Sequence, residues 1–423
     1  MKKSDFLIIG GSAAGTTAAE VIRSLLPKSS ITIATDENHE QYSRVLLPHY
    51  IRGKVNRDQV FLKKPEWYTE KDIELIKGIK ATKLGQGQHQ VNFNNGDSIK
   101  YVKLLIAVGG YVIKLNVPAA DLDNVLYMRT VEDADRIIEV AKKSKKAVII
   151  GGGFIGLEFC SCFRVNGVED VTVLVLEDYY WQGKLDEASS KVLTKTLERN
   201  GIKILTGEEV DRFEGQGSVS AVVTKSGKRF ETQAVGIGVG IRPDFSWLAG
   251  SGIKINRGIV TNEYLETNLP DVYAAGDCAE FYDVVFDRQH VMGNWANATS
   301  QGNAVGRTMA HSTSSGQANQ RTVFETASSY SINYFDGACT FIGVTDEKFA
   351  DEVISRGSVG EGKMTRIFIK TIDNVVRVVG ATIINDPSQV SPLTMAIKGR
   401  ADVSKHKDKL SDEKFDLREL ISQ

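Results

Sequence analysis

The chain has 423 residues, which is more than one hydrophobic core accommodates, so two or three domains are expected. Its 52 basic and 53 acidic side chains leave a net charge of −1, which excludes a global attraction to nucleic acid or to an anionic membrane. The longest uncharged apolar run, Ala147 to Leu157, is much shorter than the roughly 18 residues that a membrane-spanning helix needs. We therefore expect a globular protein with no membrane span.

The chain has four cysteines, Cys160, Cys162, Cys278 and Cys339. They form no CxxC pair, and Cys160 and Cys162 lie two apart on a predicted helix, so they point in different directions. The N-terminus only imitates a secretory signal, because Asp5 interrupts it and its apolar stretch is short. Reduced thiols and a cytoplasmic location are expected.

The chain opens with the pattern of a nucleotide-binding unit. The apolar run Phe6 to Ile9 predicts a strand that stops at Gly10-Gly11. A helix is predicted from Ala13 to Leu26, ended by Pro27, and a second strand from Ile31 to Ala34. Strand, glycine-rich turn, helix and strand in this order begin a parallel sheet.

In this first turn, Gly10-Gly11-Ser12-Ala13-Ala14-Gly15, the middle glycine of the GxGxxG pattern is replaced. Ser12 has a Cβ where a pyrophosphate would approach, although its hydroxyl could donate a hydrogen bond to phosphate. A carboxylate, Asp36, follows just after the second predicted strand. A plain strand-to-helix turn is the alternative interpretation.

The same pattern recurs from Ala147 onward. Ala147 to Ile150 predicts a strand, Phe154 to about Val165 a helix, and Val171 to Leu176 the next strand. The turn between the first two, Gly151-Gly152-Gly153-Phe154-Ile155-Gly156, is an intact GxGxxG. Its glycines permit a tight turn, close approach of a pyrophosphate and close packing of the helix, whose N-terminus attracts phosphate. Glu177 follows Gly156 at the same spacing at which Asp36 follows Gly15, and it is the candidate ribose-binding carboxylate.

Past residue 320 the pattern changes to short β-rich runs separated by turn residues. Strands are predicted at Tyr330 to Tyr334, Cys339 to Gly343, Thr365 to Thr371 and Val375 to Ile384, followed by a helical pattern from Leu393. This is typical of a separate α+β domain. The polar segment Ser312 to Gln320 is the predicted linker.

Five further segments carry a resemblance to a known family. Thr267 to Asp277 predicts a strand that runs into Gly276-Asp277, and here the sequence resembles the FAD- and NAD(P)-dependent pyridine nucleotide–disulfide oxidoreductase superfamily. The other similar segments are Leu104 to Gly110, Met128 to Ala134, Gly240 to Asp244 and Trp295 to Ala298. In that family the Gly-Asp carboxylate binds the ribityl chain of the flavin.

The resemblance implies an α/β fold with two Rossmann-like three-layer nucleotide-binding domains plus a C-terminal α+β domain. Residues 1–113 and 245–320 would form a discontinuous FAD-binding domain, 114–244 the NAD(P)-binding domain, and 321–423 the interface domain of a homodimer.

By the same resemblance, one set of residues would line the FAD site: Gly10, Gly11, Ser12, Ala13, Ala14, Gly15, Asp36, Arg44, Ala81, Ala107, Gly109, Arg129, Gly276, Asp277 and Trp295. A second set would hold the nicotinamide cofactor: Gly151, Gly153, Phe154, Ile155, Gly156, Glu158, Glu177 and Gly240. Phe154 and Glu158 are the candidate catalytic residues, with Phe154 as an aromatic gate between flavin and nicotinamide. No metal ligand set is predicted.

Two points in these assignments have alternatives. Phe154 could instead be a helix-start residue packed in the core. The acidic ribose position could fall on Val175 rather than Glu177, which would loosen a preference for NADH. No Arg or Lys follows directly to accept a 2′-phosphate, so NADH is favoured and NADPH is left open.

The stretch Tyr42 to Ile51 bears on the second substrate, because it resembles the flavin-side segment of NADH oxidases, coenzyme A disulfide reductases and nitrite reductase large subunits. The thiol-using members have a redox cysteine where this chain has Val45, so disulfide and peroxide reduction are disfavoured. The stretch also resembles reductases of ferredoxin and rubredoxin, which often carry a lysine near position 48, where this chain has Pro48.

We therefore expect an FAD-dependent NAD(P)H oxidoreductase whose acceptor is a small redox protein such as ferredoxin or rubredoxin. The alternatives are an NADH oxidase that reduces oxygen directly and a slow FAD- and NADH-binding protein that senses redox state through its interactions.

Overall fold

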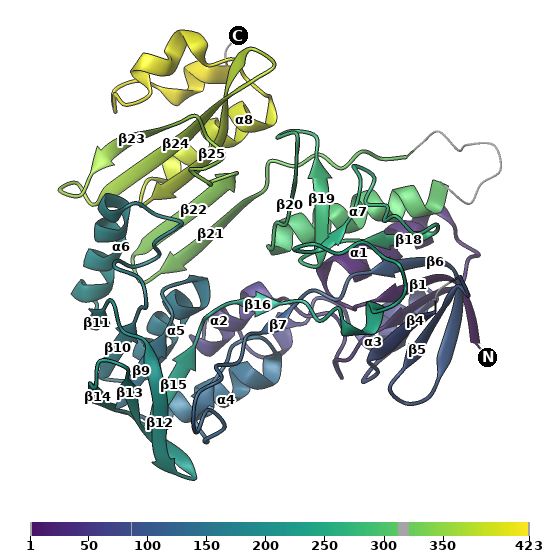
Figure 1. The fold of residues 1–423 in the computed structure, drawn as a ribbon, viewed down its shortest axis with the longest axis horizontal. Helices are drawn as coiled ribbons and strands as arrows, with labels where there is room; N and C mark the ends of the chain where they lie inside the picture. Colours follow the sequence, from purple (N-terminus) through teal and green to yellow (C-terminus); the bar gives the residue numbers. More distant parts are fainter. Residues whose placement is uncertain (1, 86, 312–320, 422–423) are drawn as a thin grey trace. The chain divides into compact units, whose positions relative to one another are not determined.

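The computed structural model describes residues 2–85, 87–311 and 321–421, which form two compact units (Figure 1). The first consists of Met1–Val45, Asn56–Tyr111 and Arg242–Thr326, and the second of Leu46–Val55, Val112–Ile241 and Ala327–Gln423. The predicted linker at 312–320 lies outside the described residues. Within the described ranges, no helix combines the length and apolar character that a bilayer crossing requires.

The first unit is built on a seven-stranded sheet in the order β3-β2-β1-β6-β5-β4, with β18 beside β6. Its strands are β1 (Lys2–Ile9), β2 (Ile31–Ala34), β3 (Ile73–Ile76), β4 (Ala81–Gly85), β5 (Gln90–Phe93), β6 (Ser98–Ile106) and β18 (Val272–Ala274). The central strands are parallel and β4 and β5 are antiparallel. Helices α1 (Ala13–Leu25), α3 (Pro65–Glu70) and α7 (Trp295–His311) belong to this unit, as do β17 (Ile259–Val260), β19 (Ala279–Asp283) and β20 (Arg288–His290).

The second unit contains a five-stranded parallel sheet in the order β11-β10-β9-β15-β8. These strands are β8 (Val125–Leu126), β9 (Lys146–Ile150), β10 (Asp170–Leu174), β11 (Ile202–Leu205) and β15 (Ala234–Ile237). The accompanying elements are α2 (Leu47–Ile51), α4 (Val131–Lys143), α5 (Phe154–Val165), α6 (Glu187–Arg199) and the small sheet of β12 (Val210–Gln216), β13 (Ser218–Thr224) and β14 (Arg229–Glu231). The chain passes between the units at β7 (Tyr111–Val112) and β16 (Ile241–Arg242).

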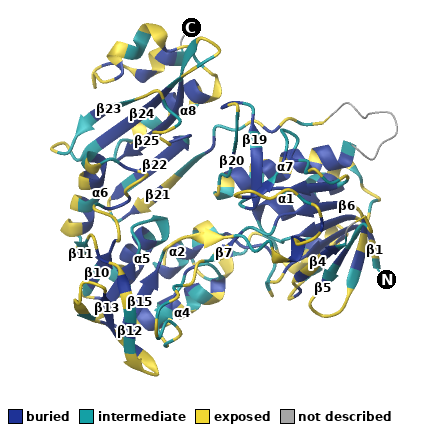
Figure 2. Ribbon diagram, in the orientation of Figure 1, coloured by how far each residue is buried: buried dark blue, intermediate teal, exposed yellow. Residues whose placement is uncertain are grey.

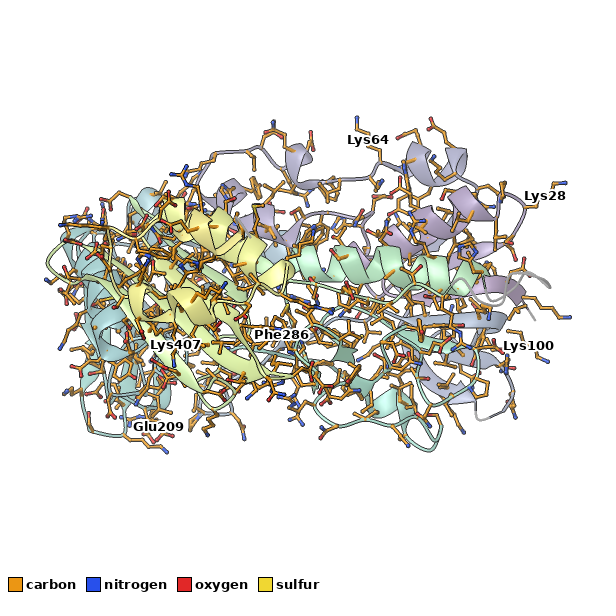
Figure 3. The ribbon with its side chains drawn as sticks, turned by 90° about the horizontal axis from the view of Figure 1, so that it is seen from above. Lys28, Lys64, Lys100, Glu209, Phe286 and Lys407 are labelled. Carbon is orange, nitrogen blue, oxygen red and sulfur yellow. The ribbon has the colours of Figure 1, made fainter. Side chains whose placement is uncertain are left out.

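The C-terminal part of the second unit is an antiparallel sheet in the order β21-β22-β25-β24-β23. Its elements are β21 (Ser329–Tyr334), β22 (Gly337–Gly343), β23 (Glu352–Ser358), β24 (Lys363–Ile372), β25 (Val375–Ile384) and the helix α8 (Val390–Lys398). Figure 2 shows that the sheets of both units are largely buried, whereas Figure 3 shows lysines such as Lys28, Lys64 and Lys100 extending outward.

The predicted fold class is confirmed, whereas most predicted elements differ from the observed ones by one or more residues at an end. Strand β1, for example, begins at Lys2 rather than at the predicted Phe6. Helix α5 and strand β2 begin and end at the predicted residues. The predicted strand Val171 to Leu176 is wrong at its end, because β10 stops at Leu174. Strand β23 was not predicted, because most of its residues are exposed or half-buried and form no apolar run. The three-domain division stays a prediction.

The packing of α1 against α7 depends on a glycine in α7. A Cβ on Gly302 would lie 2.4 Å from the carbonyl oxygen of Ala14 in α1, which is far inside van der Waals contact. A Cβ on Gly306, one turn later, would lie 3.0 Å from its nearest α1 atoms, so this end of the contact is looser. The helices can therefore approach this closely only where α7 has no side chain.

We expect Gly302→Ala to destabilise the first unit, because the added methyl group forces α1 and α7 apart. Overpacking of this kind costs about 1–3 kcal/mol, which thermal unfolding followed by circular dichroism would detect as a lower melting temperature. Asn303→Ala is the matched control, because Asn303 is the exposed neighbour on the same helix. Equal melting temperatures for the two variants would contradict this account of the packing.

Candidate functional site

The first glycine-rich turn lies at the carboxyl end of β1, where the sheet order changes direction between β2 and β6. Gly10 has a φ of +114°, and a Cβ there would lie 2.2 Å from the carbonyl oxygen of Ala107. A Cβ on Gly15 would lie 2.0 Å from the carbonyl oxygen of Gly10. Only glycine fits both positions, and this crevice at a topological switch point is where α/β sheets bind nucleotides.

The second turn repeats this construction at the end of β9. Gly151 has a φ of +103°, and a Cβ there would lie 2.6 Å from the carbonyl oxygen of Gly238. A Cβ on Gly156 would lie 2.0 Å from the carbonyl oxygen of Gly151, the same distance as in the first turn. Around Gly153 the turn is open, because the nearest atom to a Cβ is 3.8 Å away. This space fits the close approach of a pyrophosphate.

Ser12, the residue that departs from the glycine pattern, is held by Arg44. The Nη1 group of Arg44 donates a hydrogen bond to Ser12 Oγ over 2.6 Å, and its Nη2 group forms an ion pair with Glu37. Since Ser12 Oγ accepts this bond, its own hydrogen remains to donate to a phosphate oxygen. The buried Nε of Arg44 has no hydrogen-bond partner among the described residues. A cation and a hydroxyl at the turn fit an anionic pyrophosphate.

Backbone hydrogen bonds establish which residues correspond in the two units. The N–H of Gly10 donates to the carbonyl of Ala34 over 2.8 Å, and the N–H of Gly151 donates to that of Leu174 over 3.0 Å. Counted from the last glycine of each turn, Ala34 lies one position further along the chain than Leu174 does. The two units are therefore offset by one position after their helices.

Because of this offset, the equal spacing from Gly15 to Asp36 and from Gly156 to Glu177 does not place the two carboxylates at corresponding positions. The carbonyls of Glu37 and Glu177 each accept a bond from a glycine just beyond the next strand, over 3.1 and 3.0 Å. Glu177 therefore corresponds to Glu37, and the residue that corresponds to Asp36 is Leu176, which is 61% exposed. Equal spacing thus does not make Asp36 and Glu177 equivalent. Whether Glu177 binds a ribose stays a prediction.

Val175, the alternative ribose position, packs beneath the second turn. Its two methyl groups would lie 3.2 Å from a Cβ on Gly152, and the side chain is fully buried. The exposed side chains that follow it are Leu176, Glu177 and Asp178. Of these, only Glu177 and Asp178 can accept a hydrogen bond from a ribose hydroxyl.

The remaining residues of the predicted flavin site are spread along strand ends of the first unit. Gly276 follows β18 with a φ of +82°, and its N–H donates to Gln301 Oε1 of α7 over 2.7 Å. The buried Nε2 of Gln301 has no hydrogen-bond partner among the described residues, which fits a polar ligand here. The other predicted residues of this unit lie as follows: Ala81 begins β4, Ala107 and Gly109 follow β6, Asp277 follows Gly276, and Trp295 begins α7.

Two further predicted residues, Arg129 and Gly240, also lie in the second unit. Arg129 precedes α4, and its backbone N–H donates to Asp133 Oδ2 over 2.8 Å. Gly240 has a φ of +113°, and its carbonyl accepts a bond from the N–H of Ile113 over 3.0 Å. The predicted contact of Arg129 with FAD stays a prediction.

Phe154, the predicted gate, begins α5 and packs in an aromatic cluster. Its ring centroid lies 4.5 Å from Trp181, 5.0 Å from Tyr330 and 5.5 Å from Phe341. Tyr330 and Phe341 come from β21 and β22 of the C-terminal sheet, so this sheet contacts the second turn. The sequence offered no signal for this cluster. Any movement of Phe154 as a gate has to break these ring contacts.

Glu158, the second candidate catalytic residue, lies one turn after Phe154 on α5 and is ion-paired. Arg52 Nη1 donates to Glu158 Oε2 over 2.5 Å and to Ser161 Oγ over 2.8 Å. Burial raises the pKa of the Glu158 carboxyl, and Arg52 opposes that rise. Sequence reasoning missed Arg52 and Ser161, because neither belongs to a recognised motif.

No described thiol can act as a redox partner of the flavin. Val45, at the position of the redox cysteine in thiol-using relatives, is 54% exposed. All four cysteines are buried and form no disulfide, and burial raises their pKa values, to about 12 for Cys278. A thiol relay needs a thiolate, and none of the four fits that role. In the described ranges, no cluster of three or more His, Cys, Asp or Glu side chains is placed to hold a metal ion.

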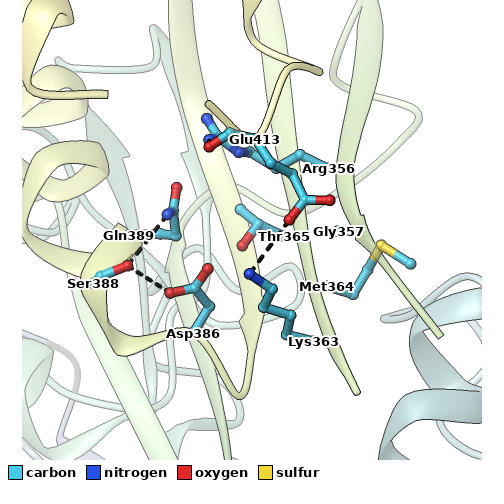
Figure 4. Close-up of a pocket in the computed structure, with 9 residues that line it drawn as sticks. All are labelled: Arg356, Gly357, Lys363, Met364, Thr365, Asp386, Ser388, Gln389 and Glu413. Carbon is cyan, nitrogen blue, oxygen red and sulfur yellow. Dashed lines mark hydrogen bonds and ion pairs between the residues drawn. The ribbon is translucent and has the colours of Figure 1, made fainter. Parts of the chain in front are cut away.

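A pocket of about 270 Å³ lies in the C-terminal sheet (Figure 4). It is lined by Arg356, Gly357, Lys363, Met364, Thr365, Asp386, Ser388, Gln389 and Glu413. Lys363 Nζ pairs with Glu413 over 3.3 Å. None of the predicted site residues lines this pocket.

Asp36 has a partner that the sequence did not indicate. The hydroxyl of Tyr111 donates to Asp36 Oδ2 over 2.5 Å. The Tyr111 ring lies beneath the Lys80 ammonium, 5.1 Å from the ring centroid. Lys80 also pairs with Asp244 over 2.8 Å, and this bond together with hydrogen bonds from Ser246 lowers the pKa of Asp244 to about 2. Tyr111 is thus held at both its hydroxyl and its ring face, and it orients Asp36.

Comparison with known proteins agrees with this arrangement. The family model described as pyridine nucleotide-disulphide oxidoreductase matches residues 4–302. NADH-rubredoxin oxidoreductase of Clostridium acetobutylicum is 32% identical over 282 residues, covering 67% of this chain and 70% of that protein.

Two further matches show how much of each related protein this chain covers. NAD(P)H nitrite reductase of Bacillus subtilis is 32% identical over 288 residues, covering 68% of this chain and 36% of that protein. The chain thus spans about a third of the length of this relative. The structure of the covalent putidaredoxin reductase–putidaredoxin complex matches with a TM-score of 0.90 at 25% identity, covering 100% of this chain and 99% of the matched one.

We expect Tyr111→Phe to weaken FAD binding, because Asp36 loses the hydrogen bond that orients it. One hydrogen bond to a charged group at an exposed position corresponds to about a fivefold higher dissociation constant. Fluorescence titration of the flavin-free protein with FAD would measure this constant. Asp277→Ala is the comparison variant and should leave the purified protein largely without flavin. A Tyr111→Phe variant with unchanged FAD affinity would show that Asp36 needs no such partner.

Proposed function

Because this chain belongs to the pyridine nucleotide-disulphide oxidoreductase family, we propose that it transfers hydride from NAD(P)H to FAD and passes electrons to a small redox protein such as ferredoxin or rubredoxin. Family members use FAD and NAD(P)H, and the two glycine-rich turns fit two dinucleotides. When bound, the flavin supplies the chemistry that converts a hydride into single electrons or pairs. The chain contributes the two binding turns, the Arg52–Glu158 pair and the aromatic cluster around Phe154.

The observation that carries the proposal is Val45, at the position of the redox cysteine of thiol-using relatives, in a chain that has two glycine-rich nucleotide turns. With no thiolate available, electrons have to leave the reduced flavin directly, and the substrates that need a thiol relay are disfavoured. The name of the Clostridium relative includes rubredoxin, and the matched structure is a complex with putidaredoxin. Both names support a small redox protein as the acceptor.

We propose three finer assignments. NADH is preferred to NADPH, because Glu177 and Asp178 would repel a 2′-phosphate and no Arg or Lys directly follows them. The protein forms a homodimer through its C-terminal domain, which rests on family resemblance. It is cytoplasmic, which is supported by its reduced, buried cysteines.

The function can be tested by mixing the flavin-loaded protein with NADH in the absence of oxygen and following the flavin absorbance at about 450 nm. We expect bleaching, followed by rapid reoxidation when rubredoxin or ferredoxin is added and slow reoxidation in air. Rapid reoxidation in air with continued NADH consumption would identify an oxidase instead. Turnover far below about 1 s⁻¹ with every acceptor would favour a redox-sensing interaction protein. An absence of bleaching would refute the nicotinamide site.

We expect Glu177→Ala to raise the KM for NADH about fivefold with little change in kcat, because a lost ribose contact removes uniform binding. Steady-state kinetics with a dye as acceptor would measure both constants. Asp178→Ala is the matched control, since it removes the adjacent exposed carboxylate. A raised KM in the control variant alone would move the ribose contact to Asp178.

A further inference from the structure

The partner of Glu158 comes from a part of the sequence that departs from the family pattern. Ferredoxin and rubredoxin reductases often carry a lysine near position 48, and this chain has Pro48 there. Helix α2 begins at Leu47, and Arg52 is its C-cap, one helical turn after Pro48. A cation therefore lies one turn beyond position 48, at the C-terminal end of this helix.

The geometry of Arg52 joins it specifically to Glu158. Its Nη1 group bridges Glu158 Oε2 and Ser161 Oγ, and the Arg52 and Glu158 side chains are only 5% and 15% exposed. Glu158 Oε2 is engaged, whereas Oε1 accepts no hydrogen bond from the described residues. A buried ion pair with a second hydrogen bond fixes the orientation of both side chains.

The other groups around Glu158 supply little charge. Cys160 and Cys162 of the same helix are neutral thiols, because burial raises their pKa values. On the side of α2, burial lowers the pKa of His49, so its imidazole is neutral at pH 7. Lys54 is exposed and acts on Glu158 only through space. Arg52 is thus the one cation hydrogen-bonded to this carboxylate among the described residues.

We infer that Arg52 is a positioning residue for the nicotinamide site. Its guanidinium pairs with Oε2 and fixes the orientation of the Glu158 carboxylate, which would leave Oε1 to accept a hydrogen bond from the nicotinamide carboxamide. This inference rests on the proposed function, because it requires Glu158 to bind the nicotinamide cofactor.

Helix α2 has other attachments, so the loss of Arg52 should leave it in place. The hydroxyl of Tyr50 donates to Asp135 of α4 over 2.7 Å. Asn166 Nδ2, just after α5, donates to the carbonyl of Ile51 over 2.8 Å. Arg52→Gln therefore tests the charge of the guanidinium with the helix still docked.

The experiment uses the flavin-loaded protein and compares Arg52→Gln, Arg52→Lys, Glu158→Gln, the double variant Arg52→Gln/Glu158→Gln and the matched control Lys54→Gln. Lys54→Gln also removes a nearby positive charge, but it breaks no hydrogen bond to Glu158. The KM for NADH and kcat are measured with a dye as acceptor, and kcat/KM is followed from about pH 5 to about pH 9. Flavin content and melting temperature are recorded for each variant.

We expect Arg52→Gln to raise the KM for NADH about 10-fold with a smaller change in kcat. Because the neighbouring cation is lost, Glu158 takes up a proton at higher pH, so the fall of kcat/KM on acidification should begin at higher pH. Arg52→Lys should restore most of the wild-type pH profile, and Lys54→Gln should change the KM less than about twofold. In the double variant, the two effects should not add.

Wild-type KM and pH profile in Arg52→Gln would overturn the inference while leaving the proposed function intact. An unchanged KM in Glu158→Gln would instead refute the nicotinamide contact, and the role of Arg52 would fall with it. Should Arg52→Gln lose its flavin or unfold, the pH profile of Arg52→Lys decides. A wild-type profile there would support the role of the charge, and an acid limb displaced to higher pH would overturn it.

Discussion

Both nucleotide-binding turns depend on one steric constraint, the contact between the last glycine of each motif and the backbone carbonyl of the first. At Gly15 and at Gly156 a Cβ would lie 2.0 Å from that oxygen, so any side chain would push the helix away from its strand. With the helix this close, its N-terminal N–H groups lie at the switch point of the sheet, where a phosphate can bind.

The two turns are built alike, but the side chains around them differ. In the first unit, Arg44 holds Ser12 and Tyr111 holds Asp36, so the groups that would contact a dinucleotide are oriented beforehand. In the second unit, an exposed Leu176 takes the position of Asp36. Preorganised polar groups strengthen binding by reducing its entropic cost. The difference is consistent with a resident cofactor in the first unit and an exchanging one in the second.

Much of this arrangement could be predicted from sequence, because glycine spacing and apolar runs are local signals. The bounds of β2 and α5 and both turns were predicted for this reason. The offset between Asp36 and Glu177 could not be, because it depends on which carbonyl each backbone N–H reaches. Equal counting along the chain cannot detect a residue gained or lost between helix and strand.

The side chains that contact Glu158 and Phe154 could not be predicted for a different reason. Arg52 and Glu158 are 106 residues apart, and Phe154 and Tyr330 are further apart still, so no sequence window contains either pair. Which side chains meet is decided by how α2, α5 and β21 pack, and this depends on the whole unit. Local patterns therefore predict candidate site residues but not the distant side chains that contact them.

The burial of every thiol has a consequence for the environments in which this protein can operate. Reactivity toward alkylating agents, peroxides and mixed disulfides requires an accessible thiolate, and all four cysteines are enclosed and protonated. With Val45 in the flavin-side segment, oxidants have no sulfur there to modify. A change in the thiol–disulfide balance of the surroundings therefore finds no accessible thiol in this chain to oxidise or to couple to electron transfer.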